Sequence, residues 1–145
     1  MSTTFEGFTQ ADFDVFQIPG LAPRMAALIA QVRPKLELLG KLLAPTLSVM
    51  CGEEIFAHVA KHARRTVHPP DDTWVAFASS RRGYKSLPHF QIGLWSTHVF
   101  VQFAVIYESQ EHKIKFAEAL RSNRQQLISG LPGNYCWSLD HMRPE

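Results

Sequence analysis

A chain of 145 residues with 46% hydrophobic and 19% charged residues has the size of one domain and can bury a core, which excludes an intrinsically disordered chain. A formal net charge of +2 is too small to mark a nucleic-acid-binding protein, so nucleic acid is a less favoured partner. The apolar runs stop short of the roughly 18 residues of a membrane span. Two cysteines without a CxxC spacing indicate reduced thiols, and we expect a single cytoplasmic domain over residues 1–145.

The first part of the chain predicts helices. A capping-box pattern from Thr9 to Asp12 predicts a short first helix. Apolar residues at helical spacing then run from Leu21 to Leu47, and they keep their phase across Pro34. We therefore expect two helices or one kinked helix with the same face on the core, and a further break near Pro45 or Gly52.

The middle of the chain predicts a helix, a loop and a strand. Residues Glu53 to Arg65 fit a helix with apolar positions on one side. The paired prolines within residues 68–72 suit neither a ladder nor a helix interior, so this range is expected to be a loop. Trp74 to Ala78 is expected to be a strand, and the polar residues 79–87 a connection.

A β-hairpin is the most specific prediction. The β-rich runs His89–Trp95 and His98–Tyr107 are separated by two residues, which is the spacing of a tight hairpin. That register places Gln91 opposite Gln102 and sorts the side chains into one purely apolar face and one mixed face. His89 shares the mixed face with the two glutamines.

The last part of the chain predicts a helix from about Glu111 to Ser129, ended by Gly130, and a final strand from Tyr135 to Leu139. The order of helices, strands, helix and strand predicts an α+β fold. In this fold an antiparallel sheet with a central hairpin has helices packed on its apolar face.

Two histidines four residues apart, His58 and His62, would share one face of the predicted helix and could share a metal ion. No third ligand accompanies them, so we predict no metal site and keep the pair only as weak candidates. A metal-assisted hydrolase using this pair, or an acid/base enzyme using His89, is the alternative function.

Positive charge is concentrated between residues 58 and 89, where six basic residues stand against two acidic ones, while the rest of the chain has a net charge of −2. Arginine forks match phosphate or carboxylate oxygens, and aromatic rings stack on a base or ring. We expect a small anionic ligand, a nucleotide or phosphorylated metabolite, although a solvated pair of loops is the simpler alternative. The candidate ligand-binding residues are Arg64, Arg65, Trp74, Arg81, Arg82, Tyr84, Lys85, His89, Gln91 and Gln102.

Five strings carry a family resemblance: HVAKHARRT (58–66), PPDDTWVAF (69–77), RGYK (82–85), LPHFQIGLW (87–95) and WSLDH (137–141). With them the chain closely resembles, over essentially its whole length, the YktB-like family of uncharacterised bacterial proteins. The resemblance implies an α+β fold with an antiparallel sheet and no particular activity or cofactor. Members of the family are usually longer, so we expect either a truncated member or a chain that lacks a C-terminal segment. In the second case we expect part of the mixed face or a sheet edge to be uncovered, which favours a homo-oligomer. An RNA- or protein-interaction domain is a further alternative.

Overall fold

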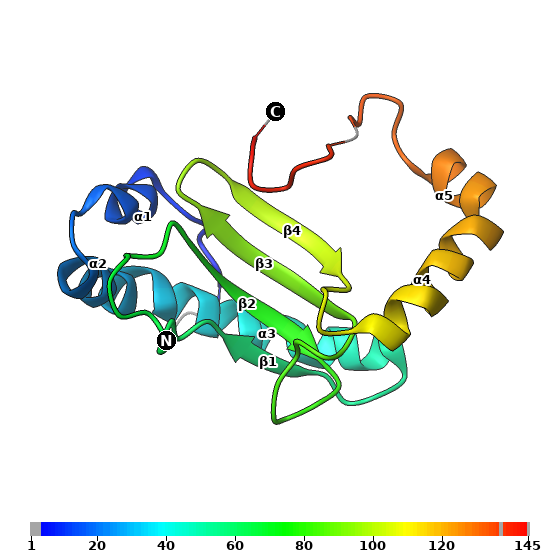
Figure 1. Cartoon of the computed structure of the whole chain (residues 1–145), viewed down its shortest axis with the longest axis horizontal. Helices are drawn as coiled ribbons and strands as arrows, with labels where there is room; N and C mark the ends of the chain where they lie inside the picture. Colours follow the sequence, from blue (N-terminus) through cyan, green and yellow to red (C-terminus); the bar gives the residue numbers. More distant parts are fainter. Residues whose placement is uncertain (1–3, 137, 145) are drawn as a thin grey trace.

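The computed structural model of the chain describes residues 4–136 and 138–144. Its centre is a four-stranded antiparallel sheet in the order β1-β2-β3-β4 (Figure 1). The strands are β1 (Phe56–Val59), β2 (Asp72–Ala78), β3 (His89–Trp95) and β4 (Val99–Ala104). The predicted α+β class, the antiparallel sheet and the central hairpin are confirmed. Among the described residues, none of the helices combines the length and the hydropathy of a membrane span.

One long helical run backs the sheet. It comprises α2 (Leu21–Ala27), a π-helical turn (Leu28–Val32) and α3 (Arg33–Cys51). The run continues through Pro34, which has no N–H to donate and comes shortly after the π-helical turn, where the helix is locally wider. The predicted helical stripe across Pro34 is therefore confirmed. The helix passes through Pro45 and ends at Gly52, whose φ of 69° is the left-handed conformation that suits glycine.

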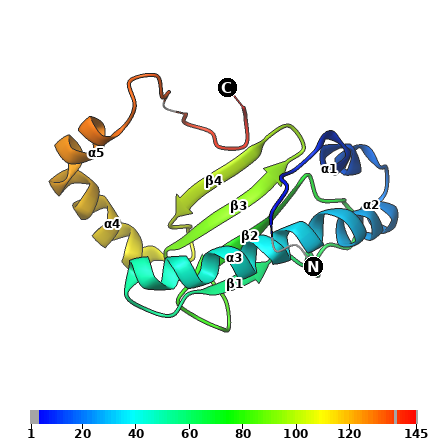
Figure 2. The ribbon, with the colours of Figure 1, turned by 180° about the vertical axis from the view of Figure 1, so that it is seen from behind.

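The core lies between this helical run and one face of the sheet (Figures 1 and 2). Gly40 of α3 brings the helix close to β1, since a Cβ at this position would lie 2.9 Å from the Cβ of Ala57. A short helix α1 (Gln10–Asp14) begins after Thr9 with the predicted capping box. The buried apolar core residues are Val15, Phe16, Leu28, Val32, Leu36, Leu39, Ile55, Val75, Phe77 and Leu94.

The prediction of a helix from Glu53 to Arg65 is wrong. Residues 56–59 form strand β1, which pairs antiparallel with β2 so that Phe56 faces Ala78 and Val59 faces Val75. The remaining residues of the range are loop. A four-residue edge strand has weak local signals, and its pairing with β2 outweighs the helical spacing of the apolar residues.

The predicted hairpin register is confirmed. Gln91 pairs with Gln102 and Ile92 with Val101, and the backbone N–H of Trp95 donates to the backbone carbonyl of His98 at 2.9 Å. Helical cover does not extend over the whole apolar face, because α3 contacts β1 and β2 and leaves β4 open. Val101 of β4 is accordingly 75% exposed.

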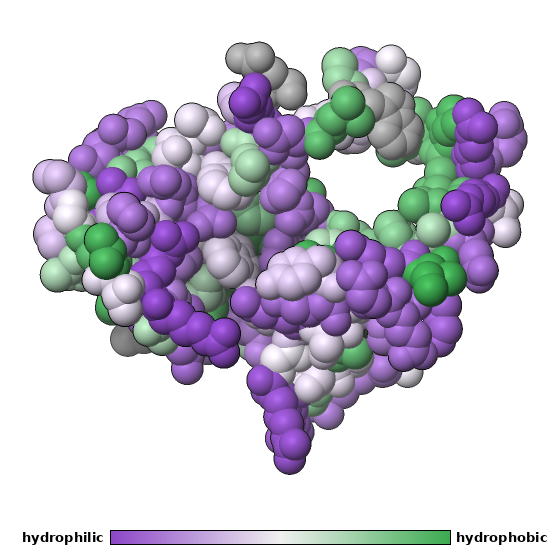
Figure 3. Space-filling model, viewed as in Figure 1, coloured by the Kyte–Doolittle hydropathy of each residue, from purple (hydrophilic) through white to green (hydrophobic). Residues whose placement is uncertain are grey.

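The end of the chain departs from its prediction. Two helices, α4 (Gln110–Ser122) and α5 (Arg124–Gly130), replace the single expected helix, and the Asn123 side chain between them donates to the Ala119 carbonyl at 2.8 Å. Neither helix contains a buried residue. Together they form an arm that contacts the sheet through Phe116, whose ring centre lies 5.3 Å from that of Phe103 in β4, and then extends away from it, with hydrophobic side chains around an opening (Figure 3).

The final strand from Tyr135 to Leu139 is absent from the described residues of that range, which are irregular; Trp137 itself lies outside the described residues. The segment that follows passes the turn of the hairpin. There the His98 side chain hydrogen-bonds to the His141 carbonyl at 3.3 Å. This end of the chain is therefore tied to the hairpin without extending the sheet.

Candidate functional site

The mixed face of the sheet lies opposite α3, and we call it the open face (Figures 1 and 2). Paired residues of neighbouring strands share a face, and so do residues two apart in one strand. Gly93 is two residues from Gln91 and therefore lies on the open face, as do its partners Trp74 in β2 and Phe100 in β4. Gln91 and Gln102 lie on the same face one step further along the strands. The open face thus combines half-buried aromatic and amide side chains.

A first hollow, the basic hollow, has a volume of about 640 Å³. Trp74 lines it together with Tyr84, and the indole N–H donates to the Tyr84 hydroxyl at 2.9 Å. Glu108 lies 4.0 Å from Lys85. The charged residues of the lining are Lys61, Arg64, Arg65, Lys85 and Glu108. Four cations against one carboxylate give the hollow a positive potential.

The two arginines of the basic hollow differ in their partners. Arg65 donates to the carbonyls of His68 and Pro69, each at 3.4 Å, and its guanidinium lies 4.0 Å from the Asp72 carboxylate. Arg64 has no ion-pair partner within the described part of the chain. Its charge is therefore available to a ligand.

An adjoining hollow of about 590 Å³ contains Arg82 and shares Tyr84 and Lys85 with the basic hollow. Arg81 does not join them. It lies 3.5 Å from the Glu54 carboxylate, with its guanidinium 4.9 Å from the centre of the Phe56 ring. The structure therefore brings together Arg64, Arg65, Arg82 and Lys85 and sets Arg81 apart.

A second hollow on the open face, the amide hollow, has a volume of about 390 Å³. The Gln102 amide donates to the Gln91 side-chain oxygen at 2.7 Å. Trp74 lines this hollow as well as the basic one, so the two are neighbours. The residues that line the amide hollow are Asp72, Trp74, Gln91, Trp95, Phe100, Gln102, Ala104, Val105, Ile106 and His141.

The histidines have separate environments. His58 donates to the Ser80 carbonyl at 2.7 Å, whereas His62, in the loop after β1, contacts the Thr73 hydroxyl at 3.3 Å. They do not share a helix face as predicted, because no helix forms there. Within residues 4–136 and 138–144, no group of three or more His, Cys, Asp or Glu side chains could hold a metal ion.

His89 is buried behind Tyr84. It is 1% exposed, its ring centre lies 4.9 Å from that of Tyr84, and its Nδ1 bonds to the Leu87 carbonyl at 2.8 Å. Burial lowers the pKa of His89, although hydrogen bonds to backbone groups oppose the change. His89 thus supports the tyrosine from beneath and lines neither hollow.

A pH effect follows from His62. Burial, and then the charges of Arg65 and Arg33, lower its pKa from 6.5 to about 4. The unfolded state therefore binds an extra proton below pH 6.5, and the free energy of unfolding should fall by about 1 to 2 kcal/mol between pH 7 and pH 5. Urea unfolding of the wild type and of His62→Gln measures this difference. Parallel pH dependences of the two proteins would contradict the assignment.

Two charged residues that line the basic hollow, Lys61 and Glu108, are not among the predicted ligand-binding residues. Lys61 precedes the basic clusters, and Glu108 lies between β4 and α4, more than 20 positions beyond Lys85. The local charge excess includes Lys61 and could have indicated it. Nothing near Glu108 in the sequence indicates that it meets the basic hollow, because the sheet pairing brings it there.

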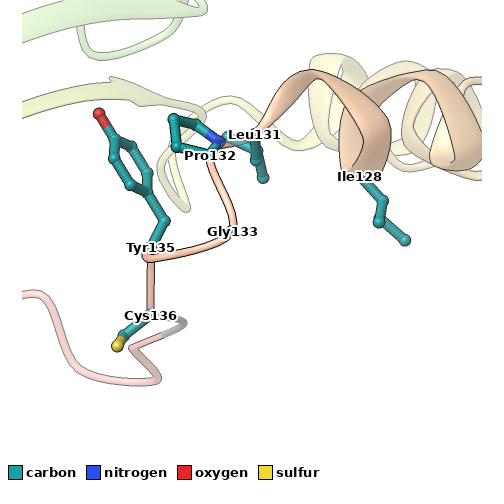
Figure 4. A pocket seen from close by; sticks show the side chains of 6 residues that line it. All are labelled: Ile128, Leu131, Pro132, Gly133, Tyr135 and Cys136. Atoms are coloured by element: carbon teal, nitrogen blue, oxygen red, sulfur yellow. The ribbon is translucent and has the colours of Figure 1, made fainter.

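One further hollow of about 360 Å³ lies at the end of α5, away from the open face (Figure 4). Its lining comes from residues 128–136 alone, and the side chains drawn in Figure 4 do not converge on one point. It has no charged side chain in its lining. We therefore centre the candidate site on the open face.

A match to a family model and the similarity to known bacterial proteins show the family of this chain. Residues 8–145 match the family model described as "Domain of unknown function (DUF1054)". A UPF0637 protein of Bacillus velezensis is 58% identical over 137 residues, which cover 94% of this chain and 65% of that protein.

A UPF0637 protein of Bacillus licheniformis is 54% identical over 138 residues, covering 95% of this chain and 65% of the relative. For one from Bacillus mycoides the identity is 50% over 141 residues, covering 97% and 67%. The chain thus spans about two thirds of the length of these relatives. It belongs to the DUF1054 family, the family of the UPF0637 proteins, which the YktB-like resemblance had indicated.

Proposed function

We propose that the open face binds a small anionic ligand that carries a ring, such as a nucleotide or a phosphorylated metabolite. The observation that supports this most is the hydrogen-bonded pair of Trp74 and Tyr84, which lies in the same hollow as Arg64 and Lys85. Aromatic faces stack on planar rings, and guanidinium and ammonium groups bind phosphate oxygens. The hollow therefore offers both kinds of contact to a single ligand.

The Tyr84 hydroxyl adds a hydrogen-bond donor. It accepts a hydrogen bond from Trp74, and its own hydrogen has no acceptor among the described residues. Burial raises the pKa of Tyr84, so the hydroxyl stays protonated at neutral pH. A phosphate or carboxylate oxygen in the basic hollow is a suitable acceptor for it.

The size and charge of the site favour a small ligand over RNA. A volume of about 640 Å³ lies in the range of small-molecule sites. The cations gather around one hollow, while the formal net charge of the whole chain is only +2. The enzyme alternatives have less support, since His58 and His62 have separate partners and His89 is buried.

Thermal unfolding with a panel of nucleoside monophosphates and sugar phosphates tests the proposal. At 100 times its Kd, a ligand of the native state adds about 2.7 kcal/mol and raises the Tm. Arg64→Ala should weaken binding at least about tenfold, since it removes a charged hydrogen bond. Arg121→Ala on the arm is the matched control. The proposal fails if no compound raises the Tm, or if the two variants bind alike.

A further inference from the structure

We infer that the ligand is a nucleotide whose base lies in the amide hollow and whose phosphate lies in the basic hollow. The inference rests on the proposed function and narrows its ligand class. Its starting point is Trp74, which lines both hollows, so that one ligand can occupy them together. A phosphorylated sugar would fill only the basic hollow.

The charges of the two hollows differ in the way that such a ligand requires. Neither lysine nor arginine lines the amide hollow, and its titratable side chains are Asp72 and His141. Burial raises the pKa of Asp72, while the charge of Arg65 opposes this. A phosphate is therefore favoured in the basic hollow, and a neutral ring in the amide hollow.

The paired glutamines present a planar hydrogen-bonding edge. Gln102 donates one amide hydrogen to the Gln91 oxygen, and among the described residues neither the Gln91 amide nitrogen nor the Gln102 oxygen has a partner. A donor and an acceptor thus lie side by side at directly paired positions of β3 and β4. The edges of nucleobases carry the complementary acceptor and donor, and glutamine reads them in this way.

The floor of the amide hollow is aromatic. The Phe100 ring lies against Gly93, since a Cβ added to this glycine would be only 2.6 Å from the Cζ atom of the ring. Trp74 borders the same glycine from β2, at 2.7 Å from that Cβ position. A base that hydrogen-bonds to the glutamines can stack on these rings, which contributes about 1–3 kcal/mol per base in other proteins.

Calorimetric titration of the purified chain with AMP, GMP, CMP, UMP, adenosine and ribose 5-phosphate tests the inference. At least one nucleoside monophosphate should bind at least tenfold more tightly than ribose 5-phosphate. The double variant Gln91→Met/Gln102→Met should lose that difference and bind ribose 5-phosphate as the wild type does. Gln125→Met, an exposed glutamine of α5, is the matched control.

The outcomes separate this inference from the proposed function. Equal affinities of the wild type for nucleotides and ribose 5-phosphate would overturn the inference and leave anion binding in place, even if the double variant did not fold. Adenosine binding as tightly as AMP, with no effect of Arg64→Ala, would overturn the proposed role of the basic hollow. Binding of none of the six compounds would overturn both.

Discussion

Replacing Gly93 with alanine is expected to lower the free energy of unfolding by about 3 kcal/mol. The new Cβ would lie 2.4 Å from the Thr73 carbonyl oxygen, and it would also overlap Phe100 and Trp74. A side chain can rotate away, but the carbonyl belongs to the neighbouring strand of the sheet. The pairing of β2 with β3 must therefore open, and the floor of the amide hollow is disturbed with it.

Urea unfolding measures this loss, and Gly83 supplies the control. A Cβ at Gly83 would meet no heavy atom within 4 Å, so Gly83→Ala should change the stability by less than about 1 kcal/mol. Similar stabilities of the two variants would show that the close approach of β2 to β3 is not as the structure has it.

Asp12→Ala is expected to cost about 3 kcal/mol, because a buried carboxylate with several donors is lost. Asp12 is 0% exposed and accepts hydrogen bonds from the Thr9 N–H at 2.7 Å and from the Lys35 ammonium at 2.5 Å. The variant leaves Lys35 without its counter-charge and the start of α1 without its cap. The attachment of α1 to α3 should weaken, while Val15 and Phe16 still hold the segment in the core.

Burial by itself would raise the pKa of Asp12, but the hydrogen bonds from Lys35 and Thr9 outweigh it, and the pKa lies below 3.8. The stability that Asp12 contributes is therefore present above pH 3.8 and lost as the pH falls through the lowered value. Denaturation of Asp12→Ala and of Asp14→Ala, an exposed control in the same helix, measures the contribution. Equal losses in both variants would contradict it.

The sequence by itself determined the hairpin and the ends of several elements. Residue alternation admits one register between β3 and β4, because a slip of one residue would turn the apolar side chains to the mixed face. The cap at Thr9 appears where the sequence predicts it, and of the two positions at which a break was expected, Pro45 and Gly52, the helix ends only at Gly52.

Strand β1 and the arm required the tertiary structure. Residues 56–59 are held in the sheet by pairing with β2, a partner distant in sequence, and their own pattern resembles a helix. The apolar stripe of α4 and α5 indicates side chains suited to burial, but Ile114 and Leu127 remain exposed. A hydrophobic pattern shows which residues favour burial, and it does not show what covers them.

The candidate site divides in the same way. The charge excess and aromatic residues of its loops can be read along the chain, yet Arg81 lies against Glu54, while Arg64 has no ion-pair partner among the residues that the structure describes. Trp74 meets Tyr84 because β2 and the following connection place them together. The direction of a loop side chain depends on contacts between distant segments, and no periodicity encodes it. The sequence therefore shows which charged and aromatic residues are available for a site. The fold determines which of them meet on the open face.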